Sequence, residues 1–497
     1  MSEPNLPLSV DGPFQGMLAN SRVDAPPGFL SFLQNFIVRD SELEPRPGIL
    51  AMSTPIGGGA DVQGIYQWEM LSGLAYTCAF ANGDLYTFDW TAGTWTLHDL
   101  GAAGLTVSTS SDINCATSRG RLILTDGVNK PCMITGILDG IGETFTQLAN
   151  APIAHRVGIY YDKVFFWDLP GAENQFEWSD EGDPVNGYSA DNQAWEFAQT
   201  DAGKILGCAP LNERMNILKE DSATVLLGSA DEDFSTLAVR EGLSETEGCV
   251  AGGSVVILNG DVFLLSQNGP RRIKQGQVWQ SLHDAGGVDY LRDLWADVDK
   301  NTMDNSLGWT DRAEKHVGFL VPQTGSADLN VALVFNEENT SWTTFKFEGF
   351  AFTAVGSVED TSGKEWVLFG DEDGVVYKYR VGFDQLSDNG TAIEYRARRR
   401  ISDGTHMKKR LTECAFLFSL DTDLQGEIGS YVDGVEGSAR VFGLYDQTGE
   451  KRYRRGFNDC GYELGWWLKV QKVGQRVTIQ KVTAMSTAVE LSDDWDG

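Results

Sequence analysis

The 497-residue sequence has few of the residues that build metal, disulfide or nucleophilic centres. Its seven cysteines form no CxxC or CxxH pair, which indicates reduced, mostly buried thiols in a cytosol and no structural zinc site. Its five histidines are scattered, without an HxH or HExxH pattern. The GxSxG, GxxxxGK[ST] and GxGxxG motifs are absent as well. We therefore expect no enzyme activity, no metal and no cofactor.

Long apolar runs and an excess of positive charge are also missing. No window holds 18 uninterrupted apolar residues, and the N-terminus has no basic stretch before an apolar run, so we expect neither a membrane span nor a secretory signal. The 39 Lys and Arg stand against 71 Asp and Glu, and this net charge of -32 argues against a protein that coats DNA or an anionic membrane. The acidic excess lies in residues 1–390, because residues 391–497 hold 16 basic and 16 acidic residues.

Glycine and aromatic residues are abundant, with 56 Gly, 14 Trp, 25 Phe and 14 Tyr, and this mixture favours β-sheet with many turns. The best helical candidate is 288–303. Elsewhere, short alternating apolar runs are separated by turn residues such as Asn82-Gly83. About seven units of roughly 25 to 45 residues follow one another, which is the period of propeller blades. Segments 81–89, 258–266 and 372–380 each place a glycine turn before alternating apolar residues.

The sequence thus predicts an all-β protein in three parts. Residues 1–60, with Pro26-Pro27-Gly28 and a second Pro-rich turn, are expected to form an extended arm. Residues 61–390 are expected to form a β-propeller of about seven blades, since one blade cannot bury both of its faces alone. Residues 391–497 lose the blade spacing and are expected to form a C-terminal β-sandwich or platform domain. Its six expected strands are 391–401, 410–420, 426–434, 438–446, 462–473 and 476–487.

Basic residues of the C-terminal part gather in three clusters, and two adjacent tryptophans follow them. In a strand, Arg396, Arg398 and Arg400 would share one face and Arg399 the other. The clusters could dock an acidic adaptor protein, contact DNA phosphates, or form a solvated face balanced by local acids. The tryptophans would point to opposite faces, one to the core and one to an interface. The interface candidates are Arg396, Arg398, Arg399, Arg400, Lys408, Lys409, Arg410, Lys451, Arg452, Arg454, Arg455, Trp466 and Trp467.

Two acidic segments suggest other functions. Asp371–Gly374 resembles the start of a cation-binding loop, but Gly382 occupies the twelfth position where a Glu would be needed, so an acidic turn is the simpler interpretation. Segment 176–184, FEWSDEGDP, distantly resembles an Asp-box, which makes a glycan-binding or glycan-hydrolysing propeller the alternative function. Such boxes usually recur in several blades, and only one weak version is present.

Four segments together resemble the tail hub or nozzle proteins of short-tailed bacteriophages, also called tail tubular or tail-stabilising proteins. In 35–49, NFIVRDSELEPRPGI, an Asn precedes an Arg-Pro-Gly turn; the matching positions are Asn35, Arg46, Pro47 and Gly48. Segment 259–273 resembles a family blade. Segment 368–400 resembles a closing strand that leads into the hairpin of the C-terminal domain, and 176–184 resembles a mid-propeller stretch.

The resemblance implies a virion structural protein, made in the bacterial cytoplasm and located in the tail. It implies a ring, usually of six copies, below the portal and the adaptor, which extends the DNA-ejection channel and anchors fibres, spikes or a plug. In that setting Gly48 would supply the bend that opens the propeller, and Pro47 would fix its approach. An acidic wall would let double-stranded DNA pass without specific binding, although acidic charge also serves solubility.

Overall fold

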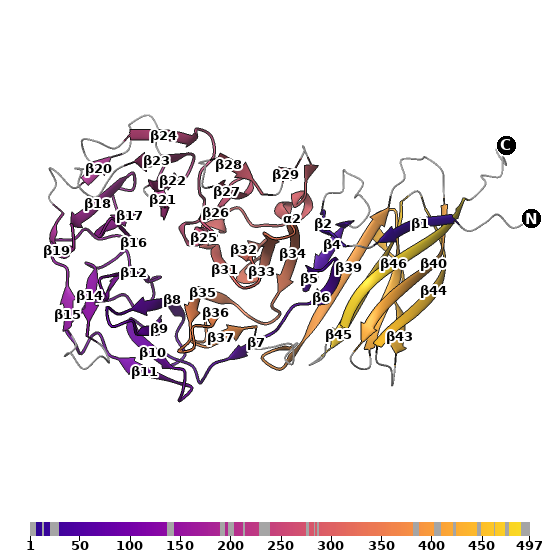
Figure 1. The fold of residues 1–497 in the computed structure, drawn as a ribbon, viewed down its shortest axis with the longest axis horizontal. Helices are drawn as coiled ribbons and strands as arrows, with labels where there is room; N and C mark the ends of the chain where they lie inside the picture. The colour runs from indigo at the N-terminus through magenta and orange to yellow at the C-terminus, as the bar shows by residue number, and fades with distance from the viewer. Residues whose placement is uncertain are drawn as a thin grey trace, which may run out of the picture.

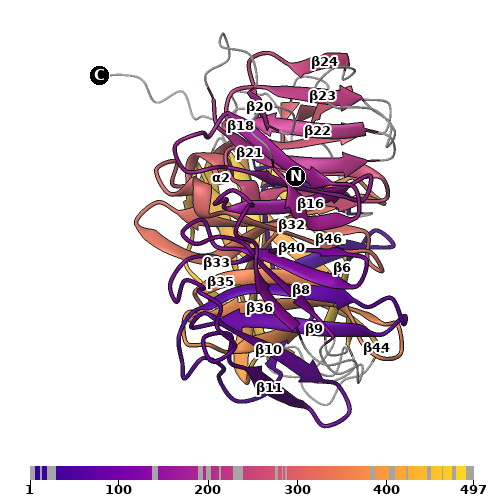
Figure 2. The same cartoon turned by 90° about the vertical axis from the view of Figure 1, so that its left-hand side faces the viewer.

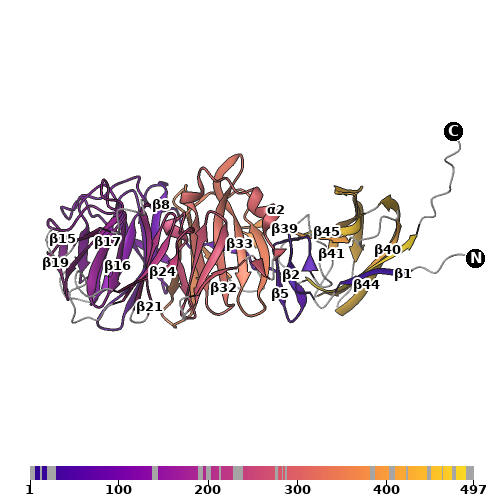
Figure 3. The same cartoon turned by 90° about the horizontal axis from the view of Figure 1, so that it is seen from above.

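The computed structural model describes residues 6–11, 14–19, 29–136, 144–188, 194–196, 203–211, 214–227, 239–274, 278–282, 284–285, 288–380, 387–401, 409–420, 424–444, 449–461, 463–472 and 477–488. Strands are the main secondary-structure element of these residues. A propeller and a C-terminal sandwich lie side by side, and the described chain begins and ends at the far end of the sandwich (Figures 1 and 3). The predicted all-β fold, with a propeller of about seven blades and a C-terminal sandwich, is confirmed.

Seven units of four antiparallel strands follow one another around a ring in the described chain. The first four blades are β8 (Val62–Glu69), β9 (Ala75–Ala81), β10 (Asp84–Asp89), β11 (Thr94–His98); β12 (Asn114–Ser118), β13 (Arg121–Thr125), β14 (Cys132–Thr135), β15 (Thr144–Gln147); β16 (Arg156–Tyr160), β17 (Lys163–Trp167), β18 (Gln175–Asp180), β19 (Asp183–Gly187), with β20 (Ala194–Glu196) also on β18; and β21 (Ile205–Leu211), β22 (Arg214–Lys219), β23 (Ala223–Leu227), β24 (Val239–Ser244). The last three are β25 (Val256–Leu258), β26 (Asp261–Ser266), β27 (Gly269–Lys274), β28 (Val278–Ser281); β31 (Leu307–Asp311), β32 (His316–Gln323), β33 (Ser326–Asn336), β34 (Ser341–Lys346); and β35 (Phe352–Glu359), β36 (Glu365–Asp371), β37 (Val376–Tyr379), β7 (Ile49–Ala51).

The ring closes by joining the two ends of the propeller sequence. The first strand of each blade lies nearest the axis, and β35 packs on β8 to complete the circle (Figures 1 and 2). First strands of neighbouring blades contact each other around most of the ring, and β21 contacts β26 and η1 of the next blade. The outermost strand of the seventh blade is β7, which comes from the N-terminal arm and pairs antiparallel with β37, Ile49 opposite Tyr379. Unpaired blade edges are thereby reduced by a strand that lies some 300 residues earlier in the chain.

The glycine turns that suggested a repeat are real but occupy different places in their blades. Asn82 and Gly83 have φ values of 54° and 76°, so they form a hairpin turn with two left-handed residues, as the sequence predicts. Segments 81–89 and 372–380 join the second and third strands of their blades, whereas 258–266 joins the first and second. The number of blades was predicted correctly, although the three motifs lie between different strands of their blades.

Two sheets face each other in the C-terminal sandwich. One contains β44 (Gly449–Gly461), β40 (Lys409–Leu420), β46 (Val477–Ala488), β6 (Glu42–Pro45), β5 (Phe36–Arg39) and β1 (Leu6–Asp11). The other continues from blade six through β4 (Phe32–Gln34), β39 (Thr391–Ile401), β45 (Leu464–Lys472), β41 (Leu424–Val432), β42 (Val435–Glu436) and β43 (Arg440–Leu444), with β38 (Ser387–Asp388) on β39. The Phe416 and Trp466 rings meet between the sheets with their centroids 5.4 Å apart. The 13-residue β44 was not among the strands predicted.

The N-terminal arm is built into both later parts of the chain. β4 pairs parallel with β34 of blade six and antiparallel with β39, so one eleven-stranded sheet runs from the propeller into the sandwich. Because β6 pairs with β46 of the other sheet, both layers of the sandwich receive a strand from the arm. The division of the chain at residues 60 and 390 stays a prediction about which parts fold together.

Helix is minor in the described residues. Within the helical candidate 288–303 only α2 (Arg292–Ala296) is α-helical. The strand β30 (Val288–Asp289) comes before it, and the helix ends at Asp297. The remaining short elements are η1 (Gly252–Ser254), η2 (Met303–Asn305), β2 (Gly16–Met17), β3 (Phe29–Leu30) and β29 (Asp284–Ala285). No described helix has the length and apolar character needed to cross a membrane.

The cysteines give a simple test of this packing. Five of the seven are buried, and burial raises the pKa of the Cys132 thiol to about 12 and that of Cys249 to about 11. Cys115 is partly exposed, but burial also raises its pKa well above the usual value. We expect Cys460, on the edge strand β44, to be the one thiol that reacts rapidly with a disulfide reagent in the native protein, because the thiolate is the reactive form. Cys460→Ser should remove the rapid phase, and two or more rapid thiols would contradict this packing.

Candidate functional site

A buried ion pair joins distant segments of the chain where the arm enters the propeller. Arg46 is fully buried, and its guanidinium forms a two-pronged ion pair with Asp388, with Nη1 to Oδ1 at 2.9 Å and Nη2 to Oδ2 at 2.5 Å. Nη1 also donates to the Pro47 carbonyl and Nη2 to the Lys346 carbonyl, both at 2.9 Å. Although burial opposes the charge, Asp388 keeps the pKa of Arg46 above its usual value. The geometry suits arginine, whose planar fork matches a carboxylate.

Asn35 completes this junction and links three elements. Its side-chain Oδ1 accepts hydrogen bonds from Arg46 Nε at 2.9 Å and from the Lys346 backbone N–H at 2.8 Å. Its Nδ2 donates to the Glu394 carbonyl of β39 at 2.7 Å. The backbone of Asn35 has φ 61°, a left-handed conformation that asparagine tolerates better than most residues. Asn35 therefore forms hydrogen bonds that link the arm, blade six and the first strand of the sandwich.

Gly48 is required by a close approach. A Cβ on Gly48 would lie 1.9 Å from the Ser387 carbonyl oxygen, so the arm passes directly against β38. Gly48 is not among the residues with positive φ, so the close contact, and not a left-handed backbone, is what requires glycine here, while its role as a bend stays a prediction. The Ile49 N–H then reaches Asp388 Oδ1 at 3.3 Å, which ties the start of β7 to the same carboxylate. We call Asn35, Arg46, Gly48 and Asp388 the arm junction.

The arginines of β39 alternate as predicted. Ala397 and Arg399 are buried, whereas Arg396 is exposed and Arg398 and Arg400 are partly exposed. Each of the three outward arginines has an acidic partner: Arg396 pairs with Glu394, Arg398 with Glu436 at 3.4 Å and Arg400 with Glu463 at 4.0 Å. This arrangement matches the balanced strand face, while docking of a partner or of DNA stays a prediction.

Both tryptophans lie on β45, directly beside the β39 cluster. Trp467 is opposite Arg398 and Trp466 opposite Arg399. Trp466 is fully buried in the core, as expected for one of the pair. Trp467 points to the other face but is only 8% exposed, and its ring fills the space above Gly429. It therefore offers little open surface in the single chain.

The remaining basic candidates do not gather with β39. Lys451, Arg452, Arg454 and Arg455 lie on the edge strand β44 of the opposite sheet, where Arg452 and Arg454 are exposed and Lys451 and Arg455 half-buried. Charged residues on an edge strand discourage pairing with another chain. Lys409 and Arg410 begin β40, opposite Gly461 and Cys460, and Lys408 lies outside the described residues. The candidates thus form two separate basic regions.

Glu394 offers a test of the balanced face. Burial alone would raise its pKa, but Lys469, 2.5 Å away, and Arg396 hold the pKa below its usual value. A carboxylate with a lowered pKa stabilises the fold above its usual pKa, and the contribution is lost as the pH falls through the folded value. We expect Glu394→Gln to lower the free energy of unfolding by about 0.5–1 kcal/mol at pH 7, since the pair is partly exposed. The difference from the native protein should shrink below about pH 4. A difference that is constant with pH would contradict this assignment.

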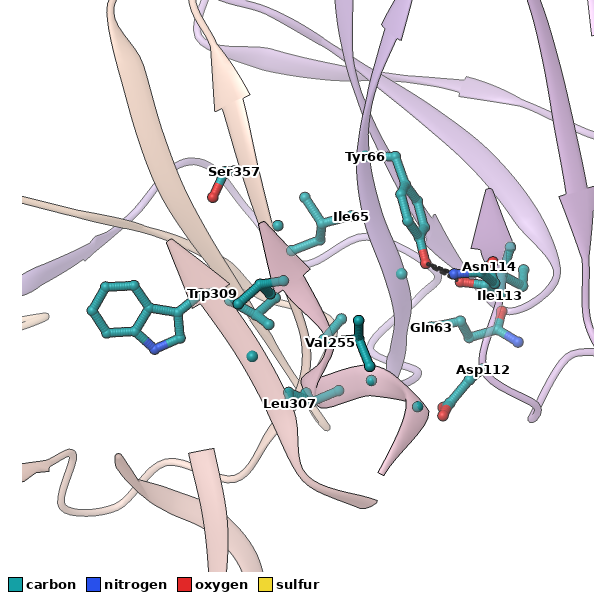
Figure 4. Close-up of a pocket in the computed structure, with 18 of the residues that line it drawn as sticks. Gln63, Ile65, Tyr66, Asp112, Ile113, Asn114, Val255, Leu307, Trp309 and Ser357 are labelled. Carbon is teal, nitrogen blue, oxygen red and sulfur yellow. Dashed lines mark hydrogen bonds between the residues drawn. The ribbon is translucent and has the colours of Figure 1, made fainter. Parts of the chain in front are cut away.

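A separate cavity of about 290 Å³ lies on the propeller axis and was not predicted from the sequence. Its wall comes from the inner strands β8, β12, β31 and β35, together with η1 and the start of β16 (Figure 4). Among the residues that the structure describes, Asp112 and Arg156 are the only charged ones that line it. Neither residue belongs to a recognisable sequence motif, so the sequence alone does not identify them as cavity residues.

The two acidic motifs lie away from this cavity. Asp371 is buried and accepts the Val375 N–H at 2.8 Å and the Tyr377 hydroxyl at 2.8 Å, as in an acidic turn. No group of three or more metal-ligating side chains occurs in the part of the chain that the structure describes. In segment 176–184, Trp178 is buried in blade three and Asp183 accepts backbone N–H groups of its own turn. Neither motif lines the axial cavity.

Comparison with known proteins adds little to this picture. No family model matches the sequence, and no curated protein matches it. Similar solved structures include YCF48 from Cyanidioschyzon merolae, with 12% identity, 67% of this chain and 98% of that chain covered, and a TM-score of 0.41. The N-terminal domain of Nup159 shows 11% identity, 70% and 98% coverage and a TM-score of 0.41. The WD40 domain of Neurospora crassa Pan2 shows 7% identity, 68% and 94% coverage and a TM-score of 0.39.

These likenesses say nothing about function, because the identities are far below 25% and the TM-scores below 0.5. The propeller assignment follows from the seven four-stranded units and their closure into a ring. The expected phage tail role, the partners and the location in the virion are not addressed by these relatives.

Proposed function

We propose that this chain is a structural protein of the tail of a short-tailed bacteriophage. It would act as a nozzle or hub subunit whose copies form a ring, six in number as the resemblance implies. The ring would receive the adaptor on one side, hold fibres, spikes or a plug on the other, and let double-stranded DNA pass.

The arm junction is the observation that carries this proposal. Segments 35–49 and 368–400 each resemble the family on their own, and they lie more than 300 residues apart in sequence. In the structure, Arg46 of the first segment forms its buried ion pair with Asp388 of the second. Asn35 of the first also bonds to the backbone of Glu394 in the second. Each of these two segments resembles the family, and the two also contact each other in the structure. Such a pair supports the family more strongly than two matching segments that lie apart.

The way the arm is built in also suits a mechanical subunit. A ring that bears load during DNA ejection needs its propeller and sandwich held together. Here β4 joins the two parts in one sheet and β7 completes a blade, so relative movement would break backbone pairing as well as the arm junction. The acidic excess of residues 1–390 suits a surface that does not retain DNA.

Mass measurement by light scattering tests the proposal. We expect a particle of about six times the 54.4 kDa chain mass, either alone or after addition of the cognate portal–adaptor complex. A chain that stays monomeric at micromolar concentration and ignores that complex would contradict the proposal.

A matched pair of variants locates the contact. Arg452 and Arg454 are the exposed basic residues of β44, so replacing both by Glu should weaken assembly on an acidic partner. Arg312, 66% exposed on the propeller, is the control, and Arg312→Glu should assemble normally. If the double β44 variant assembles as well as the Arg312→Glu control, β44 is not part of the proposed interface. The ring proposal itself would then still depend on the measured mass.

A further inference from the structure

The axial cavity holds two opposite charges that do not pair. Arg156 begins β16 and Asp112 precedes β12, so both lie where inner strands enter the ring. The side chain of Arg156 forms no hydrogen bond or ion pair with any described residue, although its charge lowers the pKa of Asp112. An arginine in a partly enclosed site normally finds a carboxylate, because its unpaired charge is costly to desolvate.

The other polar side chains near the mouth of the cavity are already satisfied. Gln63 donates to the carbonyls of Ser108 and Ser111 at 2.8 and 2.6 Å and accepts the Gly83 N–H. The Tyr66 hydroxyl donates to the Ile113 carbonyl at 2.7 Å. The Asn114 Nδ2 reaches that hydroxyl, as the dashed line in Figure 4 shows, and its Oδ1 accepts the Val157 N–H. Arg156 and Asp112 are therefore the charged side chains of the described lining that remain to meet a ligand.

Glycines keep the space beside Arg156 open. A Cβ on Gly252 would lie 3.3 Å from Arg156 Nε, and one on Gly253 would lie 3.7 Å from its Nη2. A side chain at Gly252 would crowd the guanidinium as well as the Leu206 carbonyl, whereas a Cβ at Gly253 would be in ordinary contact with it, so Gly252 in particular leaves one side of Arg156 accessible. Asp112 is an exposed residue at the lining of the cavity. Burial by surrounding protein raises the pKa of its carboxyl, Arg156 and His155 lower it, and the charge of Asp61 raises it.

We propose that the axial cavity binds a small carboxylate that also carries a hydrogen-bond donor. The ligand carboxylate would pair with Arg156, and a hydroxyl or ammonium group of the same ligand would donate to Asp112. The volume of about 290 Å³ limits the ligand to roughly the size of a sugar acid or an amino acid. The Trp309 ring points away from the cavity in Figure 4, and the Tyr66 hydroxyl is held by the Ile113 carbonyl, so the charged groups are the distinguishing feature of the site.

Saturation-transfer NMR on the full chain tests this site with three probes. D-galacturonate carries the carboxylate and hydroxyl donors, D-galactose has the same ring without the carboxylate, and γ-aminobutyrate carries a carboxylate and an ammonium group. We expect transfer to galacturonate or γ-aminobutyrate and none to galactose, and the stronger of the first two identifies the donor. Binding of galactose as strong as that of galacturonate, or no transfer to any probe at about 50 mM, would overturn the proposal.

Variants assign the binding to the two charges. Arg156→Gln should weaken the binding of the acidic probe by about tenfold or more, Arg156→Lys by less, and Asp112→Asn should weaken it as well. Arg312→Gln, which removes an exposed arginine outside the cavity, should leave the affinity unchanged. Unfolding temperatures measured alongside separate loss of the site from loss of the fold. Unchanged affinity of a folded Arg156→Gln protein would overturn the proposal, and none of these outcomes bears on ring assembly.

Discussion

Arg46→Met is expected to lower the free energy of unfolding by about 3–5 kcal/mol, because it leaves a buried carboxylate without its partner. Asp388 has a side chain only 5% exposed, so water cannot replace the guanidinium. The substitution also removes the donors that satisfy Asn35 Oδ1 and the Lys346 carbonyl. Denaturant unfolding followed by tryptophan fluorescence measures the loss.

Two variants make this result specific. Arg46→Lys keeps the charge but loses the fork, so a loss of about 2 kcal/mol is expected even if the Met variant does not fold. Arg454→Met removes an arginine that is 57% exposed and 3.9 Å from Glu413, and it should cost less than about 1 kcal/mol. If Arg46→Met and Arg454→Met were equally stable, the arm junction would not hold the arm in place.

Gly48→Ala is expected to be nearly as damaging, with a loss of about 3 kcal/mol from forced displacement of packed backbone. The added Cβ would meet the Ser387 oxygen at 1.9 Å, its carbon at 2.6 Å and its nitrogen at 2.9 Å. These are backbone atoms that cannot rotate away, so β7 must move from β38. That movement would strain both the Arg46 ion pair and the pairing of β7 with β37.

Gly456→Ala is the matched control for this change. Gly456 lies on the exposed strand β44, and a Cβ there would meet its nearest neighbour, the Thr412 oxygen, at an ordinary 3.7 Å. Its stability should change by no more than about 0.5 kcal/mol. Unfolding of both variants under the same conditions compares them directly, and a Gly48→Ala protein as stable as the control would show that the close approach is absent.

Features that depend on local pattern could be predicted from the sequence. Alternation along β39 correctly separated Arg399 from Arg396 and Arg398, because side chains in a strand point to opposite faces in turn. The Asn82-Gly83 turn follows from its two left-handed residues. The basic strand β44 was missed because its arginines indicated a charged cluster, whereas Tyr453 and Phe457 on its inner face pack against the core.

Features that depend on distant pairing could not be predicted in the same way. Resemblance to a family singled out Asn35, Arg46 and Gly48, but nothing in the chain indicates that Asp388 is the partner of Arg46. The pairing of β7 with β37 is equally remote in sequence. Arg156 and Asp112 meet only because the ring brings the ends of inner strands together. Such contacts follow from closure of the fold, which periodicity alone does not specify.

The claim on which both the fold and the proposed function depend is that Arg46 and Asp388 fasten the arm to the body of the protein. A double-mutant cycle with Arg46→Met and Asp388→Leu tests it most directly. The account predicts that the two substitutions are strongly coupled, with a coupling energy above about 2 kcal/mol and a double variant more stable than either single one. Losses that add within about 0.5 kcal/mol would contradict it.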